Sequence, residues 1–267
     1  TGVDTLAVFG HMIRFNISEC FPILTKRKMF PHAIFKELLW MLSGSTDVND
    51  LEAMGSKIWT PWRDKAFEKK HGYDDGELGP IYGWQMRRFG AHYGNRNSGH
   101  RTGFDQISWI VKELVNNPTS RRIIMSYWNP SDVNSDKVRL PPCHYSFQLN
   151  VTDNKLSGML VQRSCDVPIG SPANIQFYAA LIYMFAQQCG LMPYELVYSM
   201  ADAHIYVNQI DIERGQGSLR VTIKSSRPGM IIGRAGEGAN KLRAEVVKFL
   251  NKIKADIPKE FKLDIEE

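Results

Sequence analysis

The stretch from Leu140 to Tyr206 most constrains what this chain can fold into, because it places reactive side chains at the ends of strand-like and helix-like runs. A Pro-Pro-Cys-His sequence ends at position 144, and the residues from Tyr145 to Val151 are typical of a strand. Cys143 is therefore expected at the start of a strand, behind a rigid Pro-Pro turn. A cysteine held in this way is a candidate thiolate nucleophile, although an isolated cysteine is otherwise a small buried apolar side chain.

Several polar side chains downstream can converge on that cysteine. The sequence predicts a turn from Gly170 to Asn174, and then a helix from Asn174 to Cys189 that is apolar nearly all round and therefore buried. The polar candidates are Arg163, Ser164, Asp166, Asn174, His204 and Tyr206. An arginine, an amide and hydroxyl or carboxyl groups around a thiolate predict an anion-binding, hydrogen-bonding pocket.

Four motifs in this stretch, in order and at matching spacing, resemble those of the thymidylate synthase family. They are Pro-Cys-His at 142–144, Gln-Arg-Ser-x-Asp at 162–166, Gly-x-Pro-x-Asn at 170–174 and Asp-x-His-x-Tyr at 202–206. The matches begin near the N-terminus and run to about Gln209. The resemblance implies an α/β (α+β) fold with a mixed-sheet catalytic domain over residues 1–209. It also implies that the last part of the family's domain is missing from this chain.

The resemblance implies a reaction as well. The substrate would be dUMP and the co-substrate 5,10-methylene-tetrahydrofolate, with no metal involved. Cys143 would add to carbon 6 of the pyrimidine, which turns carbon 5 into a nucleophile. Arg163 would favour the thiolate through its positive charge. The products would be dTMP and dihydrofolate.

The family's phosphate-binding groups also have counterparts in this chain. Arg163 and Ser164 would hold the nucleotide phosphate together with Arg121 and Arg122. In the family, this arginine pair reaches across a two-fold axis, so the resemblance implies a homodimer. Without the resemblance, two arginines before an apolar strand only cap a surface.

The base and the sugar have candidates of their own. Asn174 offers both a donor and an acceptor, which the uracil edge needs, and Gln162 is assigned to the same substrate-binding set. His204 and Tyr206 would bond the sugar hydroxyl, and the alternative is a His-Tyr pair in the core. Asp166 would accept a hydrogen bond from the pterin ring and line the substrate pocket.

Upstream segments supply the remaining catalytic candidates. Glu37 lies in a predicted helix from Ala33 to Leu42, where the resemblance gives it a role in organising water and protons. Tyr82, within a Gly-Pro-Ile-Tyr-Gly motif, would belong to the proton-transfer network. Trp59 and Gly170 would line the folate site with Asp166. The alternatives are that Glu37 is a surface glutamate, that Tyr82 is a buried structural tyrosine and that Trp59 is a core tryptophan.

After Gln209 a second resemblance begins. The sequence predicts strands at 210–214, 219–225 and 261–265 with a helix at 238–252, and it resembles a type II KH domain like that of a small-subunit ribosomal protein. The Gly-x-x-G loop consists of Gly233, Arg234, Ala235 and Gly236. Residues 210–267 would then bind single-stranded RNA or DNA through this loop. A glycine-capped helical hairpin is the alternative.

Composition narrows the class of protein. The chain has a net charge of +5, which suits a phosphate-bearing substrate or nucleic acid. Its four cysteines are too scattered for a disulfide framework or a zinc site, which favours a reducing, cytoplasmic setting. No apolar run is long enough to span a membrane.

Two alternatives for the function stay open at this point. Ser171 and Ala173 replace bulkier Leu and Phe residues of the family motif, and a looser pocket would admit water and give hydroxymethyl-dUMP. Alternatively, the chain is a nucleic-acid-binding protein whose synthase-like domain is inactive.

Overall fold

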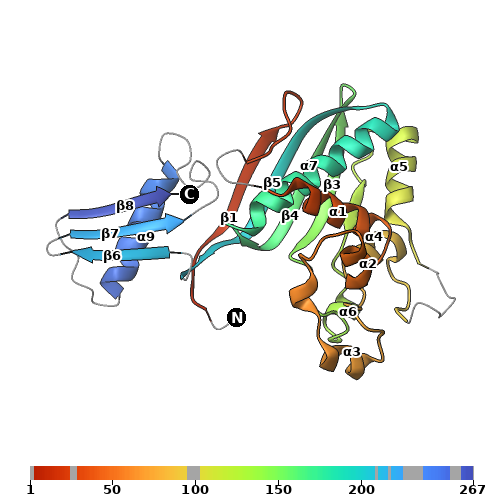
Figure 1. The fold of residues 1–267 in the computed structure, drawn as a ribbon. Coiled ribbons are helices and arrows are strands. Elements are labelled where there is room, and N and C mark those ends of the chain that lie inside the picture. Colours follow the sequence, from red (N-terminus) through yellow and green to blue (C-terminus); the bar gives the residue numbers. More distant parts are fainter. Residues whose placement is uncertain are drawn as a thin grey trace.

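The computed structural model describes residues 3–24, 29–94, 103–207, 210–215, 218–224, 237–252 and 260–266 of the 267-residue chain. Two sheets organise them (Figure 1). We call residues 3–207 the body and the described residues from 210 onward the C-terminal unit. The body contains the larger sheet and most of the helices.

The body is built on one five-stranded mixed sheet with the order β1-β5-β4-β3-β2. Its strands are β1 (Thr5–Asn16), β2 (Ile124–Ser126), β3 (His144–Thr152), β4 (Lys155–Asp166) and β5 (Met192–Tyr206). The β5-β4 pair is parallel, and the other three pairs are antiparallel. The parallel pairing sets Ser164 opposite Asp202 and Asp166 opposite His204, so two of the sequence motifs meet at the same end of the sheet.

Some helices of the body pack against this sheet and others lie farther from it (Figure 1). The helices are α1 (Pro31–Leu42), α2 (Val48–Ala53), α3 (Lys65–His71), α4 (Tyr82–Arg88), α5 (Gln106–Asn116), α6 (Pro130–Val133) and α7 (Gly170–Cys189), with a 3-10 turn at Thr60–Trp62. Aspartates 47, 64 and 105 cap α2, α3 and α5 by accepting hydrogen bonds from free backbone N–H groups. Gly190 ends α7 in the left-handed conformation, which glycine adopts without steric cost.

Helix α7 packs against β4 and β5 and forms the centre of the hydrophobic core. The ring of Phe147 on β3 is fully buried, 4.8 Å from the ring of Tyr178 on α7. Gly158 on β4 makes this packing possible, because a Cβ there would come within 2.5 Å of the Phe147 ring. The apolar character of α7 all round is thereby explained by its position.

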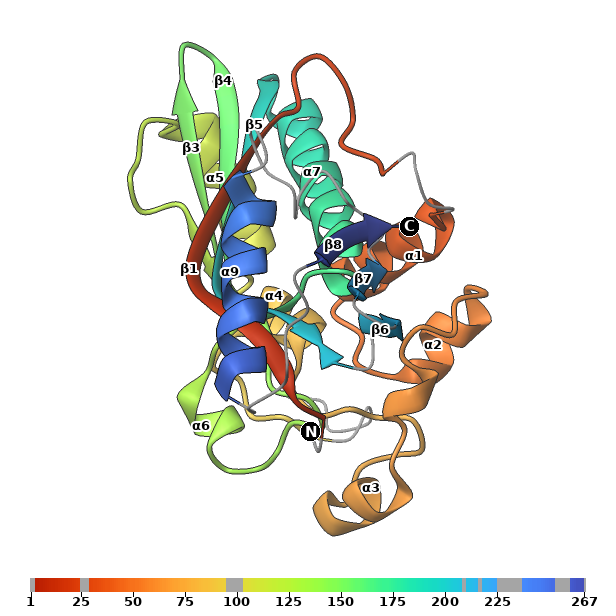
Figure 2. The ribbon, with the colours of Figure 1, turned by 90° about the vertical axis from the view of Figure 1, so that its left-hand side faces the viewer.

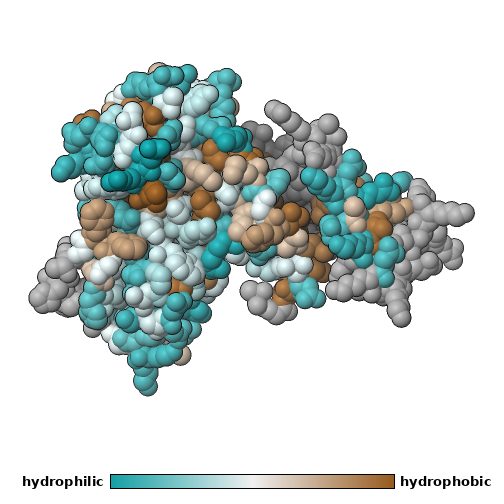
Figure 3. Space-filling view, turned by 180° about the vertical axis from the view of Figure 1, so that it is seen from behind, coloured by the Kyte–Doolittle hydropathy of each residue, from teal (hydrophilic) through white to brown (hydrophobic). Residues whose placement is uncertain are grey.

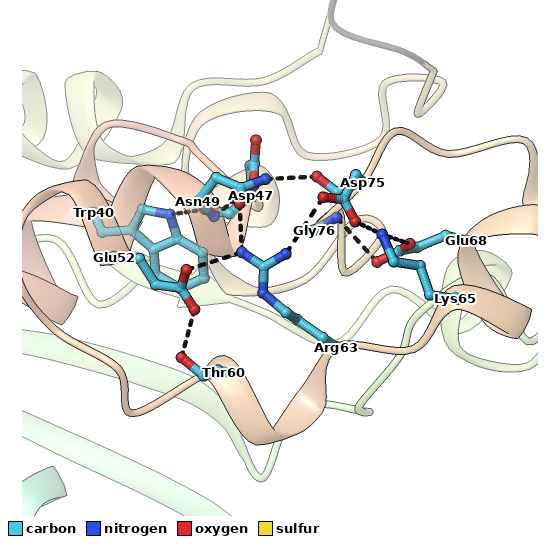
Figure 4. A network of polar contacts seen from close by, with 10 residues as sticks. All are labelled: Trp40, Asp47, Asn49, Glu52, Thr60, Arg63, Lys65, Glu68, Asp75 and Gly76. Carbon is cyan, nitrogen blue, oxygen red and sulfur yellow. Dashed lines mark hydrogen bonds and ion pairs between the residues drawn. The ribbon is translucent and has the colours of Figure 1, made fainter.

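A polar network holds the segment between α2 and α3 and fixes the turn that follows Trp59 (Figure 4). The Arg63 guanidinium bonds Glu52 at 3.0 Å and also donates to Asn49. Thr60 Oγ1 donates to Glu52 Oε1 at 2.6 Å. The network therefore anchors the 3-10 turn onto α2 and holds Trp59 in the body.

The C-terminal unit is a three-stranded sheet with one helix. Strands β6 (Ile210–Gly215), β7 (Ser218–Lys224) and β8 (Glu260–Glu266) have the order β6-β7-β8, with β6-β7 antiparallel and β7-β8 parallel. Helix α9 (Glu237–Lys252) connects β7 to β8 and packs on the sheet (Figures 1 and 2). Its described core consists of Val221, Val246 and Phe261, with Leu6 of β1 packed against it.

The elements expected from the sequence are confirmed except at one point. The stretch from Gly170 to Asn174 was predicted as a turn, but it is the first turn of α7. Pro172 is compatible with a first helical turn because no intrahelical bond needs its missing N–H there. The predicted Gly-x-x-G loop at 233–236 lies outside the described residues. Within the described part of the chain, no helix is long and apolar enough to cross a membrane.

Candidate active site

Cys143 lies in the turn before β3, where backbone and side-chain bonds hold it in place. Its N–H donates to the Tyr82 hydroxyl at 2.7 Å, and its carbonyl accepts from the Arg163 N–H at 2.8 Å. The Arg163 guanidinium donates to the carbonyls of Pro141 and Pro142 at 2.9 Å each. The two prolines thus present carbonyl groups that hold the arginine beside the cysteine, with Nη2 3.9 Å from Cys143 Sγ.

The predicted contact between Arg163 and Cys143 is therefore confirmed, but its electrostatic result differs from the expectation. Burial raises the pKa of the Cys143 thiol, and the charge of Arg163 opposes that shift without reversing it. The Cys143 side chain is therefore a thiol at neutral pH in the absence of ligand.

Tyr82 and His144 form the wall behind Cys143. Their rings stack with centroids 4.4 Å apart. Gly79 and Gly83 allow this segment to pack closely, since a Cβ would come within 2.0 Å of the Lys137 carbonyl oxygen and 2.5 Å of the Ser45 carbonyl oxygen, respectively. The Gly-Pro-Ile-Tyr-Gly motif thus positions the Tyr82 hydroxyl, whose oxygen accepts from Cys143 and whose proton remains available to donate.

His144 in this wall and the nearby Glu37 have shifted pKa values because they are buried. Burial lowers the pKa of His144 to about 3, so its ring is neutral, and its Nδ1 lies 2.8 Å from the Tyr178 hydroxyl. Burial raises the pKa of Glu37 to about 7. The Trp59 Nε1–H donates to Glu37 Oε1 at 2.5 Å and partly offsets that shift. A carboxyl group that titrates near neutral pH suits proton transfer.

The amide groups of Gln162 and Asn174 lie together where β4 meets α7. Asn174 Nδ2 donates to Gln162 Oε1 at 3.0 Å, and Gln162 Nε2 donates to the Ser164 carbonyl at 2.7 Å. The Tyr198 hydroxyl donates to the same Gln162 oxygen at 2.5 Å. The orientation of both amides is thus determined by hydrogen bonds.

The end of β5 brings the last motif to the same region. His204 is buried, with Nδ1 3.3 Å from Asp202 Oδ2, and its ring packs edge-on against that of Tyr206 at 5.1 Å. Asp166 Oδ1 accepts from the Ile169 N–H at 3.2 Å at the entry to α7, next to Gly170. The described residues include no group of His, Cys, Asp and Glu side chains that could hold a metal ion.

Arg121 and Arg122 do not join this cluster. Both are exposed and precede β2. The carbonyl of the next residue, Ile123, accepts a hydrogen bond from the Leu149 N–H on β3. Cys143 lies at the opposite end of β3. Six residues of strand separate position 143 from position 149, which corresponds to roughly 20 Å. The arginine pair therefore lies away from the pocket of its own chain.

Sequence motifs did not identify Tyr198 or Tyr178. Each lies inside an apolar element, Tyr198 on β5 and Tyr178 on α7, where an aromatic residue is expected for packing alone. Only the three-dimensional arrangement shows that their hydroxyl groups contact Gln162 and His144. Their spacing to the site residues in the sequence carries no signal of these contacts.

Comparison with known proteins gives two findings. A family model described as "Thymidylate synthase" matches residues 1–250. The expectation that the family resemblance ends near Gln209 was therefore wrong, because the match continues into α9. The protein "Thymidylate synthase 1/2" of Encephalitozoon cuniculi (strain GB-M1) is 44% identical over 220 residues, covering 81% of this chain and 74% of that protein.

Proposed function

This chain belongs to the thymidylate synthase family, and we propose that Cys143 is the nucleophile with which it converts dUMP to dTMP. Thymidylate synthases are methyltransferases that use methylene-tetrahydrofolate as co-substrate. The carrying observation is the position of Cys143 between the Tyr82 hydroxyl, the Arg163 guanidinium and the neutral His144. In this proposal the thiolate adds to carbon 6 of uracil and is expelled again at the end of the cycle.

Proton transfer is the task of the groups around that cysteine. The thiol must lose its proton before it attacks, and the hydrogen at carbon 5 must leave later. Glu37 has a pKa of about 7, so both of its protonation states are populated at neutral pH. Tyr82 has a pKa well above its ordinary value because it is buried, so it acts as a neutral hydrogen-bond donor. We assign proton exchange to Glu37 and donor contacts to Tyr82.

The direct test is to identify the nucleotide product from dUMP and methylene-tetrahydrofolate. Production of dTMP and dihydrofolate supports the proposal, and hydroxymethyl-dUMP would replace it with the alternative. The contact made by Ser171 favours methylation, because its hydroxyl is fully buried against Cys165 at 2.9 Å. The smaller side chain at position 171 is therefore enclosed in the core, whereas Ala173 is half-buried.

Base recognition is assigned to Asn174. Its Nδ2 is directed to Gln162, which leaves the amide oxygen and the second N–H for a base. Asn174→Asp should weaken dUMP binding and improve dCMP binding, because cytosine presents the opposite donor and acceptor order. Unchanged relative affinities for the two nucleotides would rule out this role.

The phosphate site is proposed to lie between two copies of the chain. Arg121 and Arg122 are exposed at the far end of β3 from Cys143, so they fit the pocket of a partner better than their own. Strand β1, at the edge of the sheet, exposes Val8, Phe9 and Met12, and apolar surface gathers in the middle of the molecule as seen from behind (Figure 3). A homodimer would cover such a face.

Mixing two inactive variants tests this arrangement. An Arg122→Ala protomer combined with a Cys143→Ser protomer should regain activity, since one site of the mixed dimer has both residues intact. Mixed dimers that form without any gain would place the phosphate contacts within one chain.

A second function is proposed for the C-terminal unit, namely binding of single-stranded RNA or DNA. The supporting observation is the topology of its described residues, in which α9 lies in the connection from an antiparallel strand pair to a third strand that is parallel to β7. That topology, with a Gly-x-x-Gly sequence between β7 and α9, is consistent with a type II KH domain. The proposed contacts are Gly233, Arg234, Ala235 and Gly236.

The test uses the full chain and labelled single strands at low and moderate salt. Arg234→Asp combined with Ala235→Asp should remove binding, because negative charge would face the phosphates while the glycines stay. Ala66→Asp with Lys69→Asp is the matched control, since both residues are exposed on α3, at the far side of the body (Figure 1). One cationic residue and one alanine are replaced by Asp in each double variant, so the net charge changes equally. Equal losses of binding in both double variants would show that net charge alone accounts for the effect. Unchanged binding by the Arg234→Asp, Ala235→Asp variant would exclude residues 233–236 as the contact.

A further inference from the structure

A series of buried polar groups runs behind Asn174, and three of its members, Ser171, Cys165 and Tyr198, have no role in the proposed reaction. Ser171 Oγ lies 2.9 Å from Cys165 Sγ, which lies 3.1 Å from the Tyr198 hydroxyl. That hydroxyl lies 2.5 Å from Gln162 Oε1. Ser171, Cys165 and Tyr198 are fully buried, and Gln162 is only 3% exposed. Four polar side chains in a core are costly unless they satisfy one another.

The direction of the hydrogen bonds in this series follows from its last member, Gln162. An amide oxygen can only accept, so Tyr198 must donate its proton to Gln162 Oε1. The Tyr198 oxygen can then accept from the Cys165 thiol, and the Cys165 sulfur can accept from the Ser171 hydroxyl. Burial raises the pKa of Cys165, which keeps the thiol proton that this order needs. All three donors therefore point toward Gln162.

Gln162 in turn fixes the orientation of the Asn174 amide. Its oxygen receives both the Tyr198 hydroxyl and Asn174 Nδ2, while its own nitrogen is occupied by the Ser164 carbonyl. A reversed Gln162 would place an N–H against the Tyr198 donor. A reversed Asn174 would set two oxygens against each other. The contacts thus select one orientation of each amide.

The orientation of Asn174 matters because an asparagine can serve either pyrimidine. In one orientation its oxygen accepts from the uracil N3–H and its nitrogen donates to O4. After a half-turn of the amide, the same side chain would match the N4 amino group and N3 of cytosine. Selectivity for uracil therefore requires that the half-turn be prevented.

We propose that Tyr198 is a positioning residue that excludes cytosine nucleotides by locking the Gln162 and Asn174 amides in the uracil-reading orientation. This role rests on the proposed function of the site. Tyr198 acts through Gln162 and through its own contact with Asn174, and it touches no reacting atom. Its removal should therefore change base selectivity more than the turnover of dUMP. Cys165 and Ser171 support it from behind.

Calorimetric titration of the full chain with dUMP and with dCMP tests the role. Tyr198→Phe keeps the ring and removes the donor, so the preference for dUMP over dCMP should narrow by about 3- to 10-fold, the range of one hydrogen bond. Tyr183→Phe is the matched control on α7, because its hydroxyl donates to the Ile17 carbonyl, away from the amides. A preference that is unchanged in folded Tyr198→Phe overturns the role.

A pair of variants at Cys165 decides the question if Tyr198→Phe does not fold. Cys165→Ala removes the donor behind Tyr198 and should narrow the preference, whereas Cys165→Ser retains an O–H and should keep it. Equal preferences in parent, alanine and serine forms overturn the proposal. A parent that fails to bind dUMP refutes the proposed function itself, whereas a selective parent with a selective Tyr198→Phe form refutes only the positioning role.

Discussion

The body and the C-terminal unit differ in how much of their chemistry is buried. The body surrounds its polar cluster with a large core, and burial shifts the pKa values of Glu37, Cys143 and His144. The described core of the C-terminal unit is Val221, Val246 and Phe261, supported by Leu6 of the body. The covalent chemistry proposed for the body needs the first environment because water must be excluded. The nucleic-acid binding proposed for the C-terminal unit would need only a charged surface.

The substitution Cys143→Ser should distinguish the functions proposed for the two regions most clearly. A serine hydroxyl in this setting is a far weaker nucleophile than a thiolate, so we expect turnover of dUMP to fall below detection while dUMP binding persists. Nucleic-acid binding by the same variant should match that of the parent. Full activity would show that Cys143 is not the nucleophile.

Cavity-forming substitutions should show that the two cores are separate. Phe147→Ala should destabilise the body by about 3–5 kcal/mol, because a fully buried aromatic ring leaves a void beside Tyr178. Val246→Ala removes less apolar surface and should cost the C-terminal unit about 1–2 kcal/mol. Hydrogen exchange read region by region distinguishes the two effects. Loss of protection in both regions with either variant would mean that they unfold as one.

A pH dependence should mark the buried site of the body. The folded pKa of Glu37 is about 7 against an ordinary value of 4.5, so between these values the folded protein holds a proton that the unfolded chain has released. This contribution to stability is complete below pH 4.5 and is lost as the pH rises through about 7. Between about pH 5 and about pH 7.5, Glu37→Gln should therefore lose less free energy of unfolding than the parent protein does.

Urea unfolding of both forms at the two pH values measures this difference. Parallel pH dependences in parent and variant would show that Glu37 titrates normally. The pH-rate profile is a second readout, since the variant should lose the acidic limb together with most of its turnover if Glu37 exchanges protons.

The smallest effect is expected at the surface of the body. Lys65 is 77% exposed at its side chain and pairs with Asp75 and Glu68 (Figure 4). Lys65→Ala should change the free energy of unfolding by less than about 1 kcal/mol, because solvent screens exposed ion pairs. Arg63→Ala should cost more, since that guanidinium is 24% exposed and bonds three partners. Equal costs would show that the network in this segment does not depend on Arg63.

The sequence predicted the elements well where local rules apply. The strand at β3, the helix at α1 and the left-handed end of α7 follow from periodicity, propensity and a glycine. The turn expected at Gly170 to Asn174 was wrong because glycine, serine, proline and asparagine also suit the first turn of a helix. A buried partner surface decided between the two, and no local rule includes that surface.

The sequence by itself determined which groups are present and in what order, since the Pro-Pro turn, the glycines at 79 and 83 and the four motifs are local features. Only the tertiary structure decided their electrical state and their orientation. The Cys143 thiol keeps its proton because desolvation outweighs the nearby arginine. Asn174 faces one way because Tyr198, remote from it in sequence, bonds Gln162. Burial and hydrogen-bond direction depend on neighbours brought together by the fold, so a linear pattern does not contain them.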